Sequence, residues 1–350
     1  MPTTSLTIGN ELLSTTMHIL MKEWRDNVHE STAFLDAAER VHGAGKPVQS
    51  GGTRIVIPLG FGEHSSTTRM QTGFERIDLT VEDVFKPAQY DWGHVVRPVA
   101  ISSEEEMTNQ GDAAVLSIIE SRTKMTANAL KREYVKQMVQ GSQTGWEDWN
   151  TLNGVDVTSG DHQGFLEQDA VGTQGNTVGS VSKSTFSSKT GWQNQMFDGA
   201  GSFNSNGLAG LYDLKVEIAS VSPNGDPNVI LASRAGFKNL KRALSAHERY
   251  VDQSKIDGGR LVEYWDGVQI NVERNMPTAG TGTTADPISF YMLNLNDIHT
   301  LWDPKGYFDL SDFETVSGEY DVRSAKLRCR GQLIAKHLGS SGIAFDLETF

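Results

Sequence analysis

The feature that most constrains the fold is a two-stranded excursion that runs directly into a long helix, across residues 52–140. Its outgoing strand, residues 53–59, places Ile55, Ile57 and Leu59 on one face. The return strand is predicted from residues that alternate between apolar and polar, namely Ile77, Asp78, Leu79, Thr80, Val81 and Glu82. A two-stranded ribbon is marginally stable alone, so it needs another surface. A second copy of the same chain supplies one, which makes self-assembly the first hypothesis.

The helix that follows is predicted from a single apolar stripe. After a strand over residues 95–101, Asn109, Gly111 and Asp112 mark a helix start. The stripe recurs every three or four residues, at Leu116, Ile119, Thr123, Ala127, Leu130, Tyr134 and Met138. From residue 112 to 140 the helix is roughly 40 Å long at about 1.5 Å per residue. Gly141 is expected to end it.

The composition limits the function. The chain has 350 residues and a formal net charge of −13, which argues against a general nucleic-acid binder but not against a container for nucleic acid. The single cysteine, Cys329, lies among alternating strand residues and is expected to be packed and unreactive. No apolar run approaches the ~20 residues that span a membrane. We therefore expect a soluble protein made in the cytoplasm, with no membrane partner.

The remaining segments predict a mixed α/β chain. Residues 1–50 indicate an arm with one or two helices, and residues 141–206 a partly ordered, polar connection with short strands. From residue 207 onward, strands alternate with helices, which is typical of an α/β domain. The predicted helices span residues 211–220 and 234–244, and the predicted strands span residues 229–232, 267–272, 289–293, 307–310 and 326–335.

The sequence offers no catalytic, cofactor-binding or metal-binding motif. A loose G-x-G-x-x-A pattern at residues 280–285 sits in a soft loop with no helix after it, which disfavours dinucleotide binding. The nine histidines are scattered, without close metal-ligand spacing. The run Glu104–Glu106 is interpreted as a solvated turn, or as acidic residues preceding a helix. We therefore predict that the chain is not an enzyme and needs no cofactor.

Several segments resemble the major capsid protein of tailed bacteriophages, which has the Hong Kong 97-type fold. Residues 52–59 look like the outgoing strand of that family's E-loop. Residues 88–92, 99–106 and 109–111 resemble the strand and turn that lead into its spine helix, and residues 6–16 also look like such coat proteins. The resemblance covers nearly the whole chain. Residues 141–206 are the part of the chain for which the resemblance gives the least assignment.

The resemblance implies an α+β capsid fold with the following parts. These are an N-terminal arm (residues 1–51), an extended E-loop (52–85), a P-domain with a long spine helix (86–140), an irregular insertion (141–206), an A-domain (207–304) and a P-domain return (305–350). It implies a coat protein that assembles into hexamers and pentamers of an icosahedral shell. The shell encloses double-stranded DNA without sequence-specific binding. Portal, scaffolding and decoration proteins are the partners implied.

In this family the E-loop lies over an adjacent subunit, so its side chains are candidates for contact between subunits. Apolar contact is expected from Ile55, Ile57, Phe61, Met70 and Phe74, and charge pairing at the rim from Arg54, Glu63, Arg69 and Glu75. Some relatives join subunits covalently through an E-loop lysine. No lysine lies between Pro47 and Phe85 here, so we predict no cross-link of that kind.

Two other structural roles remain open at this point. An encapsulin-like compartment of the same fold would package a protein cargo instead of a genome. A phage tail or decoration protein would form rings or tubes, although the long helix after the ribbon disfavours it.

Overall fold

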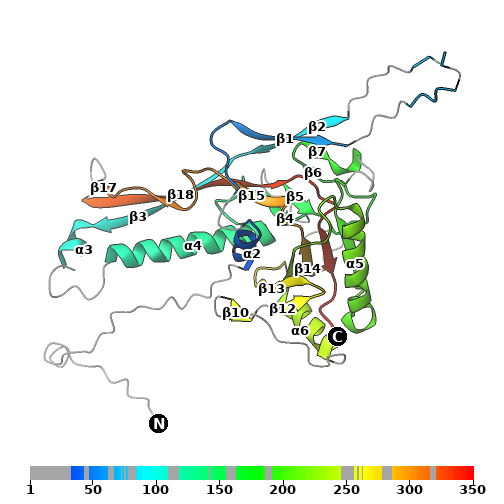
Figure 1. Ribbon diagram of the computed structural model, residues 1–350. Helices are drawn as coiled ribbons and strands as arrows, with labels where there is room; N and C mark the ends of the chain where they lie inside the picture. Colours follow the sequence, from blue (N-terminus) through cyan, green and yellow to red (C-terminus); the bar gives the residue numbers. More distant parts are fainter. Residues whose placement is uncertain are drawn as a thin grey trace, which may run out of the picture.

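The computed structural model describes residues 33–42, 47–61, 67–71, 73–74, 76–77, 84–108, 118–141, 143–154, 163–185, 191–245, 256–257, 260–261, 263–277, 286–315 and 321–350. Within them lie two larger sheets with helices packed on them, and a two-stranded ribbon that leads away from both (Figure 1). The predicted helix start at residues 109–112 lies outside the described residues, as does all of the N-terminal arm before residue 33.

A five-stranded sheet is built on one long strand, β18 (Val322–Ala335). It pairs antiparallel with β3 (Gly93–Ser102) on one side. On the other side lie β15 (Ile298–Trp302), β16 (Asp309–Leu310) and β17 (Glu314–Thr315). Along β18, Ala325, Leu327 and Cys329 are buried whereas Lys326 and Arg328 are exposed, the alternation of a sheet with one covered face. The predicted strand over residues 326–335 is confirmed and begins earlier.

Helix α4 (Ile118–Gln140) runs along this sheet (Figure 1). Leu130, Tyr134 and Met138 of the predicted stripe are buried in the core. At the other end of the helix Ile119 keeps 36% of its surface exposed, so the stripe is covered only toward the C-terminus. Gly141 ends the helix with a φ of 79°, a left-handed conformation that glycine adopts without strain, as predicted.

A short helix, α3 (Ser103–Thr108), follows β3 directly and corrects the interpretation of Glu104–Glu106. These residues form the helix instead of preceding it. The Glu105 N–H donates to Ser102 Oγ and the Ser102 N–H donates to Glu105 Oε2, both at 3.2 Å. This reciprocal pair is a capping box, so Glu105 stabilises the helix start from within.

A six-stranded sheet forms the second body. Its strands in spatial order are β12 (Glu263–Trp265), β13 (Val268–Val272), β9 (Val229–Ala232), β14 (Ile288–Leu293), β19 (Gly342–Phe345) and β8 (Gln195–Asp198). Ile230 and Met292 face α5 (Leu208–Val221) and α6 (Arg234–Ser245) in one apolar cluster. Leu231 and Tyr291 face the opposite way, into the cluster around α4. The central strands are therefore buried on both faces.

The ribbon consists of β1 (Arg54–Gly60) and β2 (Phe85–Asp91), paired antiparallel from Arg54–Asp91 to Gly60–Phe85. The predicted outgoing strand is confirmed. Among the described residues the return strand spans Phe85–Asp91, C-terminal to the residues 77–82 from which we predicted it. Ile77 is described outside any strand, and residues 78–83 lie outside the described residues.

The described parts of residues 143–206 pack into the body, and the short strands expected there are present. They are β4 (Thr151–Asn153), β5 (Gly164–Leu166), β6 (Thr177–Val178) and β7 (Val181–Ser182), with helical turns η2 (Lys183–Thr185) and η4 (Phe203–Gly207). Trp146, Trp149 and Trp192 are fully buried. Two further elements are α2 (Ala33–Val41) near the N-terminus and the small hairpin of β10 (Ile256–Asp257) and β11 (Arg260–Leu261).

The two sheets interleave in sequence, and this differs from the expected boundary at residue 304. Strand β15 precedes that boundary but pairs with β18 in the five-stranded sheet. Strand β19 follows it but joins the six-stranded sheet through β14 and β8. The C-terminal segment therefore contributes strands to both sheets, β18 to the five-stranded one and β19 to the six-stranded one. Sequence periodicity does not indicate which sheet a short apolar strand joins.

Candidate assembly surfaces

The base of the ribbon is fixed to the body by hydrogen bonds. The Tyr90 hydroxyl donates to the Ala335 carbonyl at 2.9 Å and accepts from the Ala335 N–H at 3.3 Å. The Gln89 N–H donates to the Gly179 carbonyl at 2.9 Å. Because Tyr90 is buried, these bonds are shielded from water and hold β2 against β18.

The predicted contact residues at the base of the ribbon are engaged within their own chain. Ile55 is 1% exposed and belongs to the core, and Ile57 packs against it. The Phe61 ring lies edge-on to Trp192, with ring centroids 5.4 Å apart. Arg54 pairs with Asp91 across the ribbon at 2.7 Å. We expected the apolar side chains of Ile55, Ile57 and Phe61 to face a neighbouring subunit, but in the structure they pack within their own subunit.

The far end of the ribbon differs sharply from its base. We define the arm as residues 61–84; Figure 1 shows its described tip beyond both sheets. Phe74 is 96% exposed and Met70 is 54% exposed, with Ile77 and Arg69 exposed beside them. Glu63 and Glu75 lie outside the described residues. Large apolar side chains this exposed indicate a surface that another protein covers. A role in subunit contact stays a prediction for all nine residues.

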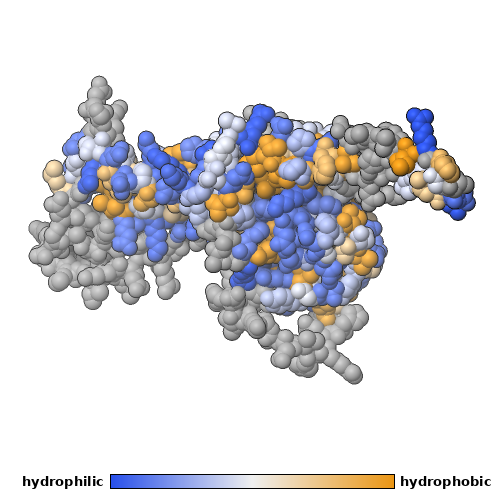
Figure 2. Space-filling view, turned by 45° about the horizontal axis from the view of Figure 1, so that its top comes forward, coloured by the Kyte–Doolittle hydropathy of each residue, from blue (hydrophilic) through white to orange (hydrophobic). Residues whose placement is uncertain are grey.

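A second surface lies on the five-stranded sheet. Along β18 the residues between the buried ones point away from α4, and they include Lys326, Arg328 and Arg330. A groove of about 490 Å³ opens here and is lined by Trp92, His94, Asp303, Lys305, Gly306, Arg328 and Arg330. We call it the basic groove, because it holds three cationic side chains and one carboxylate. With the top of the molecule turned forward, hydrophilic and hydrophobic side chains are interspersed along its upper part (Figure 2).

The cations of the basic groove are not equivalent. Arg330 pairs with Asp303 at 2.9 Å, and its guanidinium stacks 5.0 Å from the centre of the Trp92 ring. Arg328 and Lys305 are exposed and have no ion pair among the described residues. The indole N–H of Trp92 is buried without a hydrogen-bond partner in the described part of the chain. The groove therefore retains unused capacity to bind an anionic group.

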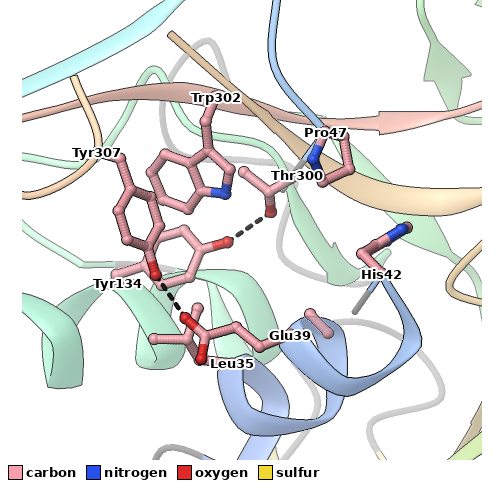
Figure 3. Close-up of a pocket in the computed structure, with 9 residues that line it drawn as sticks. Leu35, Glu39, His42, Pro47, Tyr134, Thr300, Trp302 and Tyr307 are labelled. Atoms are coloured by element: carbon pink, nitrogen blue, oxygen red, sulfur yellow. Dashed lines mark hydrogen bonds between the residues drawn. The ribbon is translucent and has the colours of Figure 1, made fainter. Parts of the chain in front are cut away.

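Helix α2 packs on the rest of the chain beside Tyr134, Trp302 and Tyr307, a contact that we call the aromatic joint (Figure 3). The Tyr307 hydroxyl donates to Glu39 Oε1 at 2.7 Å, and the Tyr134 hydroxyl bonds to Thr300 Oγ1. The cavity between these residues is only about 20 Å³, space for about one water molecule. The joint holds α2 in place and does not form a ligand site.

A histidine pair, with His299 buried and His42 partly buried, lies beside this joint. The His42 and His299 rings have centroids 5.1 Å apart. Burial lowers the pKa of His299 to about 3, and burial together with nearby Lys336 lowers the pKa of His42. Neither His42 Nε2 nor His299 Nδ1 has a hydrogen-bond partner among the described residues. Burial therefore favours the neutral form of both rings in the folded chain.

We expect acid to destabilise the subunit through this pair. A histidine whose pKa is lowered on folding binds its proton more tightly in the unfolded chain. The contribution of His299 to the free energy of unfolding is therefore fully present above about pH 6.5 and is lost as the pH falls toward 3. The loss is about 1.4 kcal/mol per pH unit for a fully titrating group. Replacing His299→Phe should flatten the pH dependence of thermal unfolding between about pH 7 and pH 4. The exposed His94→Gln should leave it unchanged. Equal slopes in both variants would contradict this account.

Residues 143–206 contain a buried ion pair. Lys183 Nζ lies 3.0 Å from Glu167 Oε1, and Lys183 is 0% exposed. It also donates to the Phe165 carbonyl at 2.6 Å and to Asn194 Oδ1 at 3.0 Å. Glu167 accepts from the backbone N–H groups of Gly175 and Asn176. Burial lowers the pKa of Lys183 to about 8, and the attraction of Glu167 opposes that shift.

The sequence did not single out either the basic groove or the buried pair. Arg328 and Arg330 carry a usable signal, because they alternate with Leu327 and Cys329 and must share one face of the strand. Their approach to Trp92 and Lys305 depends on pairing between segments more than two hundred residues apart, which no local pattern reveals. Lys183 stands in a Ser-rich stretch that looks solvated.

Other chemical features of the described residues are few. Cys329 is buried, and burial raises the pKa of its thiol, in agreement with the packed strand position that we predicted. Among the described residues no group of three or more His, Cys, Asp or Glu side chains is placed to hold a metal ion. No described helix is long and apolar enough to cross a membrane.

Comparison with known proteins gives matches in structure only. Neither protein-family models nor curated sequences match the chain. The capsid asymmetric unit of cyanophage A-1(L) aligns with a TM-score of 0.64 at 14% identity, covering 97% of this chain and 98% of that one. The capsid of the native GTA particle aligns with a TM-score of 0.60 at 12% identity, covering 98% and 99%.

An encapsulin is among the similar structures as well. The holo-SrpI encapsulin complex from Synechococcus elongatus PCC 7942 aligns with a TM-score of 0.56 at 11% identity, covering 97% of this chain and 95% of that one. Because coverage is nearly complete on both sides, the likeness concerns the whole chain and not a shared motif. The predicted resemblance to phage capsid proteins is confirmed at the level of the fold. The chain therefore has the fold of these phage capsid, GTA-particle capsid and encapsulin chains.

Proposed function

We propose that this chain is the major capsid protein of a tailed bacteriophage, assembling into an icosahedral shell around double-stranded DNA. The observation that carries the proposal is the end-to-end match to the cyanophage capsid, at 97% and 98% coverage. The role is structural and not enzymatic. In the virion, copies form hexamers and pentamers, and portal, scaffolding and decoration proteins are the further partners that such a shell uses.

The proposal gives each part of the chain a role. By the Hong Kong 97-type arrangement, residues 1–51 are the N-terminal arm, 52–85 the E-loop, 86–140 and 305–350 the P-domain with α4 as its spine helix, 141–206 the insertion and 207–304 the A-domain. The sheet pairing adjusts these bounds, because β15 belongs with the P-domain sheet and β19 with the A-domain sheet. Its support is the exposed arm tip, where Phe74 and Met70 offer apolar surface that the subunit itself does not cover. The arm of one copy contacts the next copy around a capsomer.

A protein nanocompartment is the second candidate, favoured by the encapsulin match. The two functions differ in what the shell encloses. Particles purified from the native source and treated with nuclease should retain protected double-stranded DNA of genome length if the chain is a phage capsid. Particles that instead hold a single protein species, without protected DNA, would overturn the capsid proposal and support the compartment.

We expect the shell to be held together without a lysine cross-link in the arm. Because no lysine lies between Pro47 and Phe85, the arm has no amine to form an isopeptide bond with a neighbour. Mature particles boiled in detergent with reductant should therefore run as a single band of subunit size, near 38.4 kDa. A ladder of covalent multimers would show that this expectation is wrong.

A further inference from the structure

The buried ion pair of Lys183 and Glu167 has a third member, the side-chain amide of Asn194. Lys183 Nζ lies 3.0 Å from Asn194 Oδ1 and 3.0 Å from Glu167 Oε1. Lys183 and Asn194 are 0% exposed, and Glu167 is 4% exposed. An amine, a carboxamide and a carboxylate that can carry a proton therefore meet where bulk water does not reach. An ordinary ion pair needs only the first and the last of these groups.

We propose that Lys183 and Asn194 form an isopeptide bond within one subunit, with Glu167 as the proton carrier. A first proton passes from the Lys183 ammonium to Glu167 and leaves a neutral amine, which attacks Cγ of Asn194. Glu167 then gives its proton to Nδ2 and accepts a second proton from Nζ. The Nζ–Cγ bond has formed, the Cγ–Nδ2 bond has broken with its electron pair on nitrogen, and ammonia leaves. Atoms and charges balance without a further reactant.

The carboxamide of Asn194 is held and polarised for this attack. The backbone N–H of Glu167 donates to Asn194 Oδ1 at 2.9 Å, so it stabilises the negative charge that develops on this oxygen. Nδ2 donates to the carbonyls of Glu167 and Gln195, at 2.9 and 3.2 Å, and these bonds fix the plane of the amide. The reacting groups are therefore positioned before the reaction begins, which lowers its entropic cost.

The amine and the carboxylate are also prepared for proton transfer. Burial lowers the pKa of Lys183 to about 8, so its neutral form costs less free energy than that of a lysine in water. Glu167 is kept beside Nζ by two backbone donors, the N–H of Gly175 at 2.9 Å and the N–H of Asn176 at 3.1 Å. The exclusion of bulk water keeps hydrolysis of the amide from competing with attack by the amine.

The bond would fasten separate elements of one chain. Glu167 follows β5, Lys183 begins η2, and Asn194 directly precedes β8 at the edge of the six-stranded sheet. Because all three groups belong to one subunit, the inference does not depend on the proposed function, and boiled particles would still run at subunit size. The ion pair is the state before the bond forms, and Lys183→Met prevents both.

Peptide mapping of the full-length wild-type chain tests the proposal directly. Trypsin cleaves after Lys189, which separates Lys183 from Asn194 in sequence. The digest should contain one branched peptide that joins residues 137–189 to residues 190–215, about 17 Da lighter than the two together because one ammonia is lost. Separate peptides alone would overturn the proposal. A loss of the same mass confined to residues 190–215 would also overturn it, because it would indicate cyclisation of Asn194 without a bond to Lys183.

Three variants test the role of each group. Asn194→Ala should abolish the branched peptide, whereas Lys326→Met, at an exposed position on β18, should leave it unchanged. Glu167→Gln keeps the amine and the amide but cannot carry the proton, so the branched fraction should fall at least about tenfold. A branched peptide that persists in Asn194→Ala, or that is undiminished in Glu167→Gln, would contradict the proposal. The wild-type digest decides the matter even if a variant does not fold.

Discussion

Replacing Lys183→Met should lower the free energy of unfolding by about 3–5 kcal/mol, among the largest effects expected for one side chain here. The ammonium is fully buried and lies 3.0 Å from Glu167, so its removal leaves a carboxylate without its counter-charge. It also removes donors to the Phe165 carbonyl and to Asn194 Oδ1. Urea unfolding of unassembled subunits measures the loss.

The effect should depend on the pair and not on lysine as such. Lys326→Met, at an exposed position on β18, should change stability by no more than about 0.5 kcal/mol. The double variant Lys183→Met with Glu167→Gln should recover part of the loss, because the uncompensated charge is gone while an amide oxygen still accepts from the backbone. A loss from Lys183→Met as small as that from Lys326→Met would contradict the structural role of the pair.

Shortening the arm should abolish shell formation and leave the subunit folded. Residues 62–83 are replaced by Asn-Gly, which closes a two-residue hairpin turn between Phe61 and Val84. The Phe61 N–H already donates to the Val84 carbonyl at 2.9 Å, so the pairing of the ribbon continues to the new turn. The contact of Phe61 with Trp192 is kept. Sedimentation of the variant should show small species only.

A length-matched control distinguishes the effect of the length of the arm from the effect of its side chains. Replacing residues 62–83 with a Gly/Ser sequence of equal length keeps the reach of the arm but removes its apolar and acidic side chains. This variant should also fail to assemble, because contact depends on groups such as Phe74, which the subunit leaves 96% exposed. Circular dichroism should match the wild type in both variants. Normal shells from the shortened variant would show that the arm does not join the subunits.

The elements predicted best from sequence are those in which apolar residues recur with one clear period. The stripe of α4 has a single apolar face, and Gly141 ends it, so both its existence and its end were predictable. Strand β1 shows clean alternation and begins within one residue of its predicted start. In both cases the local pattern agrees with the tertiary contacts that bury it, which is why it is informative.

The failures arise where tertiary contacts override the local pattern. The pairing of Phe85–Asp91 with β1 was not predicted, because Pro87 makes a strand harder to recognise there. The bonds of Tyr90 to Ala335, which anchor β2 against β18, join segments too distant in sequence to be predicted. The buried Lys183 and the basic groove likewise depend on distant segments meeting, so neither was predictable from its own neighbourhood.

Electron microscopy of the purified wild-type protein tests the central claim most directly. If the chain is a shell protein that joins its copies through the arm, the images should contain closed icosahedral particles. A reconstruction should then place the arm of each subunit on its neighbour. Protein that remains monodisperse as monomers under every assembly condition, including co-expression with candidate scaffolding proteins, would contradict the account.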